Sequence, residues 1–99
     1  MKIAITGHTS GLGKTLALKL KNNHQIIGFN RKNIPIENYK KIVSESLDCD
    51  IFINNAHAYF YQTLLLQEIF NKWKNKNKTI ENIISRSKYP NISEGFLYS

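Results

Sequence analysis

The feature that most constrains the fold lies at the N-terminus, where a short β-branched segment runs directly into a glycine-rich loop. Residues 2–6 (KIAIT) have the composition of a buried strand, and Gly7 follows at once. Leucines mixed with lysines from Gly11 to about Asn23 then have the spacing of a helix. This order predicts a phosphate-binding loop, because glycines permit a tight turn and a helix N-terminus attracts negative charge. An ordinary structural turn is the alternative.

Strands and helices alternate along the rest of the chain. We expect strands at 25–29, 51–54 and 79–84 and helices at 37–47 and 59–73, followed by a loop over 85–93 and the start of another helix near residue 92. Alternation of this kind is typical of βαβ units with right-handed crossovers. The sequence therefore predicts one α/β domain over residues 1–99, with about four parallel strands and three helices.

The charge balance is the clearest signal in the composition. Fourteen Lys and Arg residues against seven Asp and Glu give a net charge of +7, which is typical of proteins that bind nucleic acid or phosphate. Residues 72–78, however, alternate Lys with Asn, which indicates a biased composition, and we expect no nucleic-acid partner. The chain also has no apolar run near the ~20 residues that a membrane span needs. We expect a soluble cytoplasmic protein without a membrane partner.

Few residues are available for a disulfide or a metal site. Cys49 is the one cysteine, and there are three histidines. An internal disulfide is excluded, and a structural zinc site is not expected. We predict no metal site and a packing role for Cys49.

The glycine loop also comes close to a second phosphate-binding motif. Residues 13–15 (GKT) end like the phosphate loop of kinases and ATPases, which requires a glycine five residues before Gly13. His8 occupies that position, and residues 54–55 are asparagines where an acidic residue would hold magnesium. A phosphotransferase is therefore an alternative function rather than the preferred one.

Together with Asn54-Asn55-Ala56 after the third strand, the pattern Thr6-Gly7-x-x-x-Gly11-x-Gly13 resembles the short-chain dehydrogenase/reductase family. The resemblance spans the whole chain and implies a Rossmann-like parallel sheet, shortened relative to the family, that binds a dinucleotide. The cofactor-binding residues that it implies in this part of the chain are Gly7, Thr9, Ser10, Gly11, Leu12, Gly13, Asn54, Asn55 and Ala56.

The end of the second strand bears on the choice of cofactor. An acidic residue there would favour NAD, whereas an arginine accommodates the 2′-phosphate of NADP. The chain has Asn30-Arg31-Lys32 at this point, which favours NADP(H) over NAD(H). A solvated turn is the alternative for these residues.

The same resemblance implies that Ser85 and Tyr98 are catalytic. The inherited chemistry would be hydride transfer between NADP(H) and a carbonyl or alcohol substrate. The family's lysine, four residues after its tyrosine, would follow Ser99, so the chain looks truncated. In that family the positive charge of the lysine lowers the pKa of the tyrosine, which is ~10 when unperturbed, so that proton transfer near neutral pH is possible. Without this lysine we expect impaired catalysis. A non-catalytic dinucleotide-binding module is a further alternative, and the helix at 59–73 suggests a homodimer or homo-oligomer.

Overall fold

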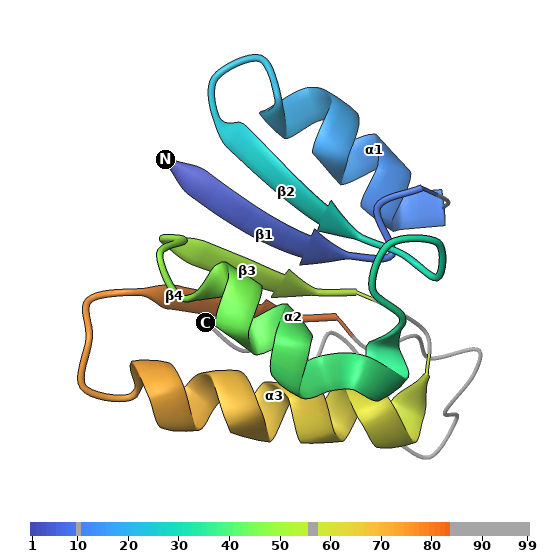
Figure 1. Ribbon diagram of the computed structural model, residues 1–99. Coiled ribbons are helices and arrows are strands. Elements are labelled where there is room, and N and C mark those ends of the chain that lie inside the picture. Colours follow the sequence, from blue (N-terminus) through green and yellow to red (C-terminus); the bar gives the residue numbers. More distant parts are fainter. Residues whose placement is uncertain (10, 56–57, 84–99) are drawn as a thin grey trace.

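The computed structural model describes residues 1–9, 11–55 and 58–83 (Figure 1). The strands are β1 (Lys2–Thr6), β2 (Gln25–Phe29), β3 (Ile51–Asn54) and β4 (Thr79–Asn82). The helices are α1 (Gly11–Leu20), α2 (Tyr39–Ser46) and α3 (Tyr59–Trp73), and a 3-10 turn, η1 (Ile36–Asn38), precedes α2. The predicted α/β class, with four strands and three helices in the described part of the chain, is confirmed.

All four strands pair in parallel, in the order β2-β1-β3-β4. The chain leaves β1 toward β2 on one side and later returns to place β3 on the other side. The direction of winding therefore reverses between β1 and β3. In open α/β sheets, ligands bind at the carboxyl ends of the strands beside such a reversal.

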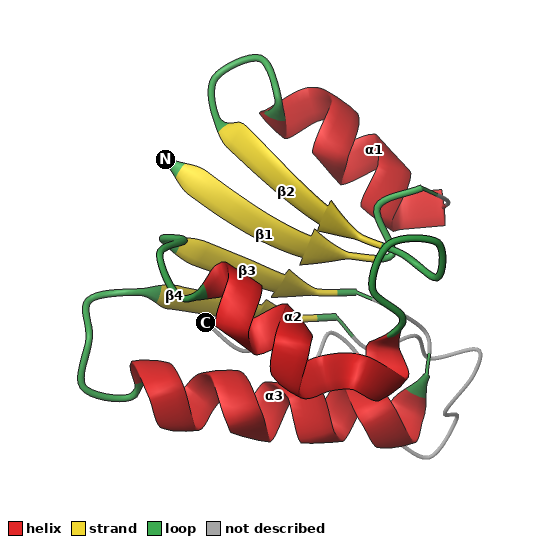
Figure 2. Cartoon of the chain, viewed as in Figure 1, coloured by secondary structure: helices red, strands yellow, loops and turns green. Residues whose placement is uncertain are grey.

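The helices cover both faces of the sheet, with α1 on one face and α2 and α3 on the other (Figure 2). Alternate side chains of β1 show this division, because Ala4 belongs to the core under α2 and α3, whereas Ile3 and Ile5 belong to the core under α1. Burial on both faces explains why Ile3 to Thr6 are all buried in a row.

The larger core lies between the sheet and helices α2 and α3. Phe52 of β3 is fully buried, and its ring meets Trp73 of α3 edge to face, with 6.4 Å between the centroids. Cys49 is also fully buried in this cluster, which confirms its predicted packing role. Large apolar contacts of this kind supply most of the stability of a small domain.

Three element boundaries differ from the sequence-based expectations. The first helix ends at Leu20 rather than near Asn23, because the chain must turn there to enter β2, and His24 N donates to Leu20 O at 3.0 Å. The helix expected from residue 37 begins with η1, and α2 itself starts at Tyr39. Strand β4 ends at Asn82, so the expected strand to residue 84 is shorter. The loop and helix expected after residue 84 fall outside the described residues.

Within the described residues, none of the helices combines the length and apolar character required to span a bilayer.

Candidate functional site

The loop between β1 and α1 is shaped by glycines. Gly7 and Gly11 have φ values of +68° and +56°, which lie in the left-handed region that glycine adopts without steric cost. Gly13 is needed for a different reason, because a Cβ atom there would lie 2.0 Å from the carbonyl oxygen of Gly7 and 2.4 Å from Nδ2 of Asn55. The first turn of α1 thus presses directly against the end of β1, as the sequence predicts for a tight strand-to-helix turn.

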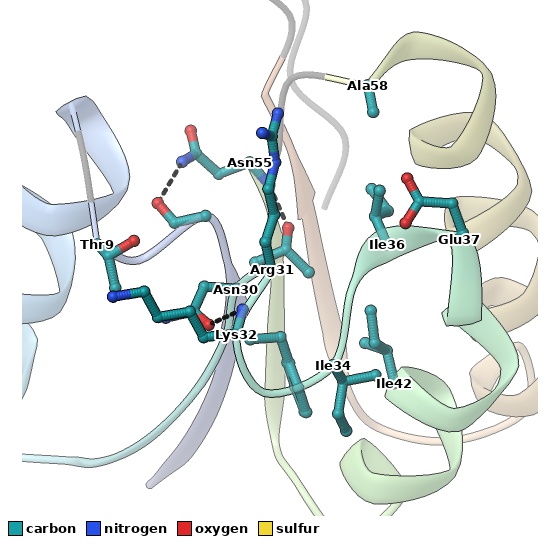
Figure 3. Close-up of a pocket in the computed structure, with 13 residues that line it drawn as sticks. Thr9, Asn30, Arg31, Lys32, Ile34, Ile36, Glu37, Ile42, Asn55 and Ala58 are labelled. Carbon is teal, nitrogen blue, oxygen red and sulfur yellow. Dashed lines mark hydrogen bonds between the residues drawn. The ribbon is translucent and has the colours of Figure 1, made fainter.

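A cavity of about 440 Å³ opens beside this loop, at the carboxyl edge of the sheet (Figure 3). The loop after β1, the segment from the end of β2 to α2, and the residues after β3 all contribute to it. The lining residues are Thr6, Gly7, Thr9, Phe29, Asn30, Arg31, Lys32, Ile34, Ile36, Glu37, Ile42, Asn55 and Ala58.

The turn that carries Arg31 and Lys32 is fixed by two asparagine side chains. Asn30 Oδ1 accepts hydrogen bonds from the backbone N–H groups of Lys32, at 2.8 Å, and Asn33, at 3.1 Å. Asn33 Oδ1 accepts from the Asn30 N–H at 2.7 Å, while its Nδ2 donates to Gly28 O at 2.7 Å. Because side chains of this kind replace backbone partners in turns, the two cations stand on a rigid base.

The charge of the pocket is mainly positive. Arg31 and Lys32 are exposed at its rim, and Glu37 is the one acidic residue that lines it among those described. In Figure 3 the Lys32 side chain extends toward the side of Thr9 and that of Arg31 toward the side of Asn55. The nearby N-terminus of α1 adds a partial positive charge. An anion is therefore the ligand that the pocket favours electrostatically.

The two asparagines at the end of β3 have different roles. Asn54 is fully buried, and its Nδ2 donates to Gln62 O and to Asn82 Oδ1, both at 2.9 Å. Gln62 Nε2 donates in return to Asn54 O at 3.0 Å. These bonds join β3, β4 and α3, and Asn54 does not line the pocket. Asn55 does line it, so the structure separates two residues that the sequence placed in one site.

The remaining predicted site residues divide into three groups. Thr9, Asn30, Arg31 and Lys32 line the pocket, and their binding of a cofactor stays a prediction. Leu12 is half exposed and is not among the lining residues. Ser10, Ala56, Ser85 and Tyr98 lie outside the described residues.

Sequence reasoning missed the apolar wall of the pocket. Ile34, Ile36 and Ile42 line it, as does Ala58 before α3. The available signal was the connection from β2 to α2, since any segment that follows a parallel strand emerges at the same edge of the sheet.

No group of three or more His, Cys, Asp or Glu residues in residues 1–9, 11–55 and 58–83 is placed to hold a metal ion. The pocket itself pairs two cations with one carboxylate, which does not suit a divalent cation.

The sequence model of one family, viral alkaline exonuclease, matches residues 7–93. No curated protein and no solved structure matches the chain significantly. The family match overturns the resemblance to short-chain dehydrogenases/reductases, and with it the predicted oxidoreductase function. It also removes the alternatives of a phosphotransferase and a dinucleotide-binding module.

The physical reason for the error is that a glycine loop at the end of a parallel strand indicates affinity for phosphate and does not say which molecule carries it. His8, at the position where the phosphate loop of kinases and ATPases requires a glycine, packs its ring against Gly28, where an added Cβ would lie 2.4 Å from the ring. The preference for NADP(H) stays a prediction that nothing tests. Since the family model spans residues 7–93 of 99, the chain belongs to the viral alkaline exonuclease family.

Proposed function

We propose that this chain binds nucleic acid and that the pocket at the carboxyl edge of the sheet holds the phosphate backbone. The observation that carries the proposal is the pair of exposed cations, Arg31 and Lys32, held on a fixed turn at the rim of the pocket. Membership of a family named for an exonuclease supports nucleic acid as the source of the phosphate.

Electrostatics beyond the pocket support the same proposal. The net charge of +7 draws a polyanion toward the chain, and counterion release then favours binding. The expectation that nucleic acid is not a partner rested on a compositional bias toward Lys and Asn, and we replace it with this proposal. Hydrogen bonds of Asn30 and Asn33 hold the turn that carries Arg31 and Lys32 beside the cavity that these two cations line.

The experiment is a titration of labelled single-stranded and hairpin DNA by fluorescence anisotropy across a salt series. Replacing both Arg31 and Lys32 by alanine should weaken binding about tenfold or more and reduce the dependence on salt, because each lost phosphate contact lowers the log–log slope by ~0.7 for single strands. The matched control removes two exposed lysines, Lys72 and Lys74, at the other end of the sheet. That control should change affinity less than threefold.

Two results would contradict the proposal. An equal loss in the pocket variant and the control would show that only overall charge attracts DNA. Tight binding of NADPH by a chain that does not bind DNA would assign the pocket to a different ligand.

A further inference from the structure

One residue that lines the pocket, Asn55, carries a buried hydrogen-bond acceptor that has no partner in the part of the chain that the structure describes. Asn55 is 2% exposed, and among the described residues its Oδ1 has no hydrogen-bond donor. The backbone N–H of Asn55 donates to Thr6 Oγ1 at 2.9 Å, and its Nδ2 donates to Gly7 O at 3.4 Å. A buried acceptor left in this state is costly. Asn54 Oδ1 is in the same state away from the pocket, so it is the place of Asn55 in the pocket lining that makes its Oδ1 a candidate ligand contact.

The orientation of this amide is fixed by its surroundings. If the group were flipped, Oδ1 would face the carbonyl oxygen of Gly7, and two acceptors would oppose each other. The carbonyl of Gly7 therefore selects the orientation in which Nδ2 is occupied and Oδ1 is left for another donor. Because Asn55 lines the pocket, a ligand there is the available source of that donor (Figure 3).

The size and lining of the pocket limit what that ligand is. A cavity of about 440 Å³ has the size of a small-molecule site, which accommodates one nucleotide and not a double helix. The half-buried side chains of Ile34 and Ile36 give it an apolar wall for a base, while Arg31 and Lys32 stand at the rim for a phosphate. A base inside a duplex is stacked and paired and cannot reach such a wall without leaving the stack.

We propose that the pocket holds one unpaired nucleotide of a single strand and that Asn55 Oδ1 accepts a hydrogen bond from that nucleotide. This inference rests on the proposed binding of nucleic acid. The donor is an amino group of the base or a hydroxyl group of the sugar, both of which are neutral donors that fit a neutral acceptor.

The first test compares single-stranded DNA with a hairpin duplex of the same length. The wild-type chain should prefer the single strand by about tenfold, and Asn55→Ala should remove most of that preference without changing the salt dependence. Asn71→Ala, an exposed asparagine of α3, is the matched control and should keep the preference. Circular dichroism of each variant checks that it is folded.

The second test uses only the wild-type chain, so it does not depend on how Asn55→Ala folds. Deoxyadenosine monophosphate should compete with labelled single-stranded DNA, and deoxyribose 5-phosphate should compete at least tenfold more weakly, because it lacks the base. Two analogues identify the donor: purine deoxyriboside monophosphate lacks the amino group, and dideoxyadenosine monophosphate lacks the sugar hydroxyl. One of the two should compete about tenfold more weakly than the parent nucleotide.

The outcomes separate this inference from the proposed function. Equal binding of single strand and duplex, with loss in the Arg31 and Lys32 variant, would overturn the inference and keep the function. Competition unchanged by both analogues would overturn the role of Asn55. Absence of any DNA binding would overturn both.

Discussion

Replacing Gly13 by alanine should destabilise the chain, although helix propensity alone predicts the opposite. Alanine in a helix is favoured over glycine by up to ~1 kcal/mol. In this structure, however, the added Cβ would lie 2.0 Å from the backbone oxygen of Gly7 and 2.4 Å from Asn55 Nδ2. Neither the end of β1 nor the buried amide can move freely, and overpacking of this kind costs about 1–3 kcal/mol.

The net expectation is a loss of about 1–2 kcal/mol in the free energy of unfolding. For a domain of this size, that loss lowers the melting temperature by roughly 4–16 °C. Thermal unfolding followed by circular dichroism, together with urea unfolding followed by the fluorescence of Trp73, measures both quantities. Trp73 is the single tryptophan and is buried, so its emission reports on the core.

Lys14→Ala, at an exposed position of the same helix, is the control and should change stability by less than ~0.5 kcal/mol. A Gly13→Ala variant as stable as the wild type, or more stable, would refute the reasoning. It would mean that α1 does not press against the end of β1 as closely as the structure places it.

Three further predictions concern buried contacts elsewhere in the scaffold. Gln62→Leu removes the hydrogen bonds from Nε2 to Asn54 O and to Ile83 O, and it should lower the free energy of unfolding in urea by about 1–3 kcal/mol. Gln67→Leu, at an exposed position of the same helix, is the control and should lower it by less than ~0.5 kcal/mol. Equal effects would contradict a role for the buried amide. Lys78→Met removes two hydrogen bonds, to Leu47 O and Cys49 O, and a cation 4.9 Å from the centroid of the Trp73 ring. We expect the free energy of unfolding to fall by about 1–2 kcal/mol and the tryptophan emission to change. An unchanged emission would argue against the contact between Lys78 and Trp73. Burial raises the pKa of the Cys49 thiol, so the folded chain holds this proton more tightly than the unfolded chain. The contribution of the thiol to the free energy of unfolding should be full below the ordinary cysteine pKa of about 8.5 and should fall as the pH rises above it. Cys49→Ala should flatten that fall.

Much of the site was predictable from local sequence rules, and the rest depended on contacts between distant segments. Gly7 and Gly11 could be recognised because a strand that turns at once into a helix needs positive φ values. The different roles of Asn54 and Asn55 could not, because adjacent residues at a strand end point to opposite sides and only the packing of α3 shows which side is buried.

The prediction of a homodimer through residues 59–73 remains a prediction. Phe60 and Phe70 of α3 are 66% and 55% exposed, while the opposite side of the helix packs in the core through Leu65 and Ile69. Part of the apolar character of this helix therefore serves the fold, which the sequence pattern alone did not separate from an interface.

The sequence by itself determined the alternation of strands and helices and the tight glycine turn of the first loop, because both follow from local periodicity and glycine placement. Binding of phosphate by this loop stays a prediction, and the sequence did not determine the type of ligand, since the same loop geometry serves many molecules. The tertiary structure decided which residues share the pocket, because the strand order β2-β1-β3-β4 brings Gly7, Arg31 and Asn55 from three separate segments to one edge of the sheet.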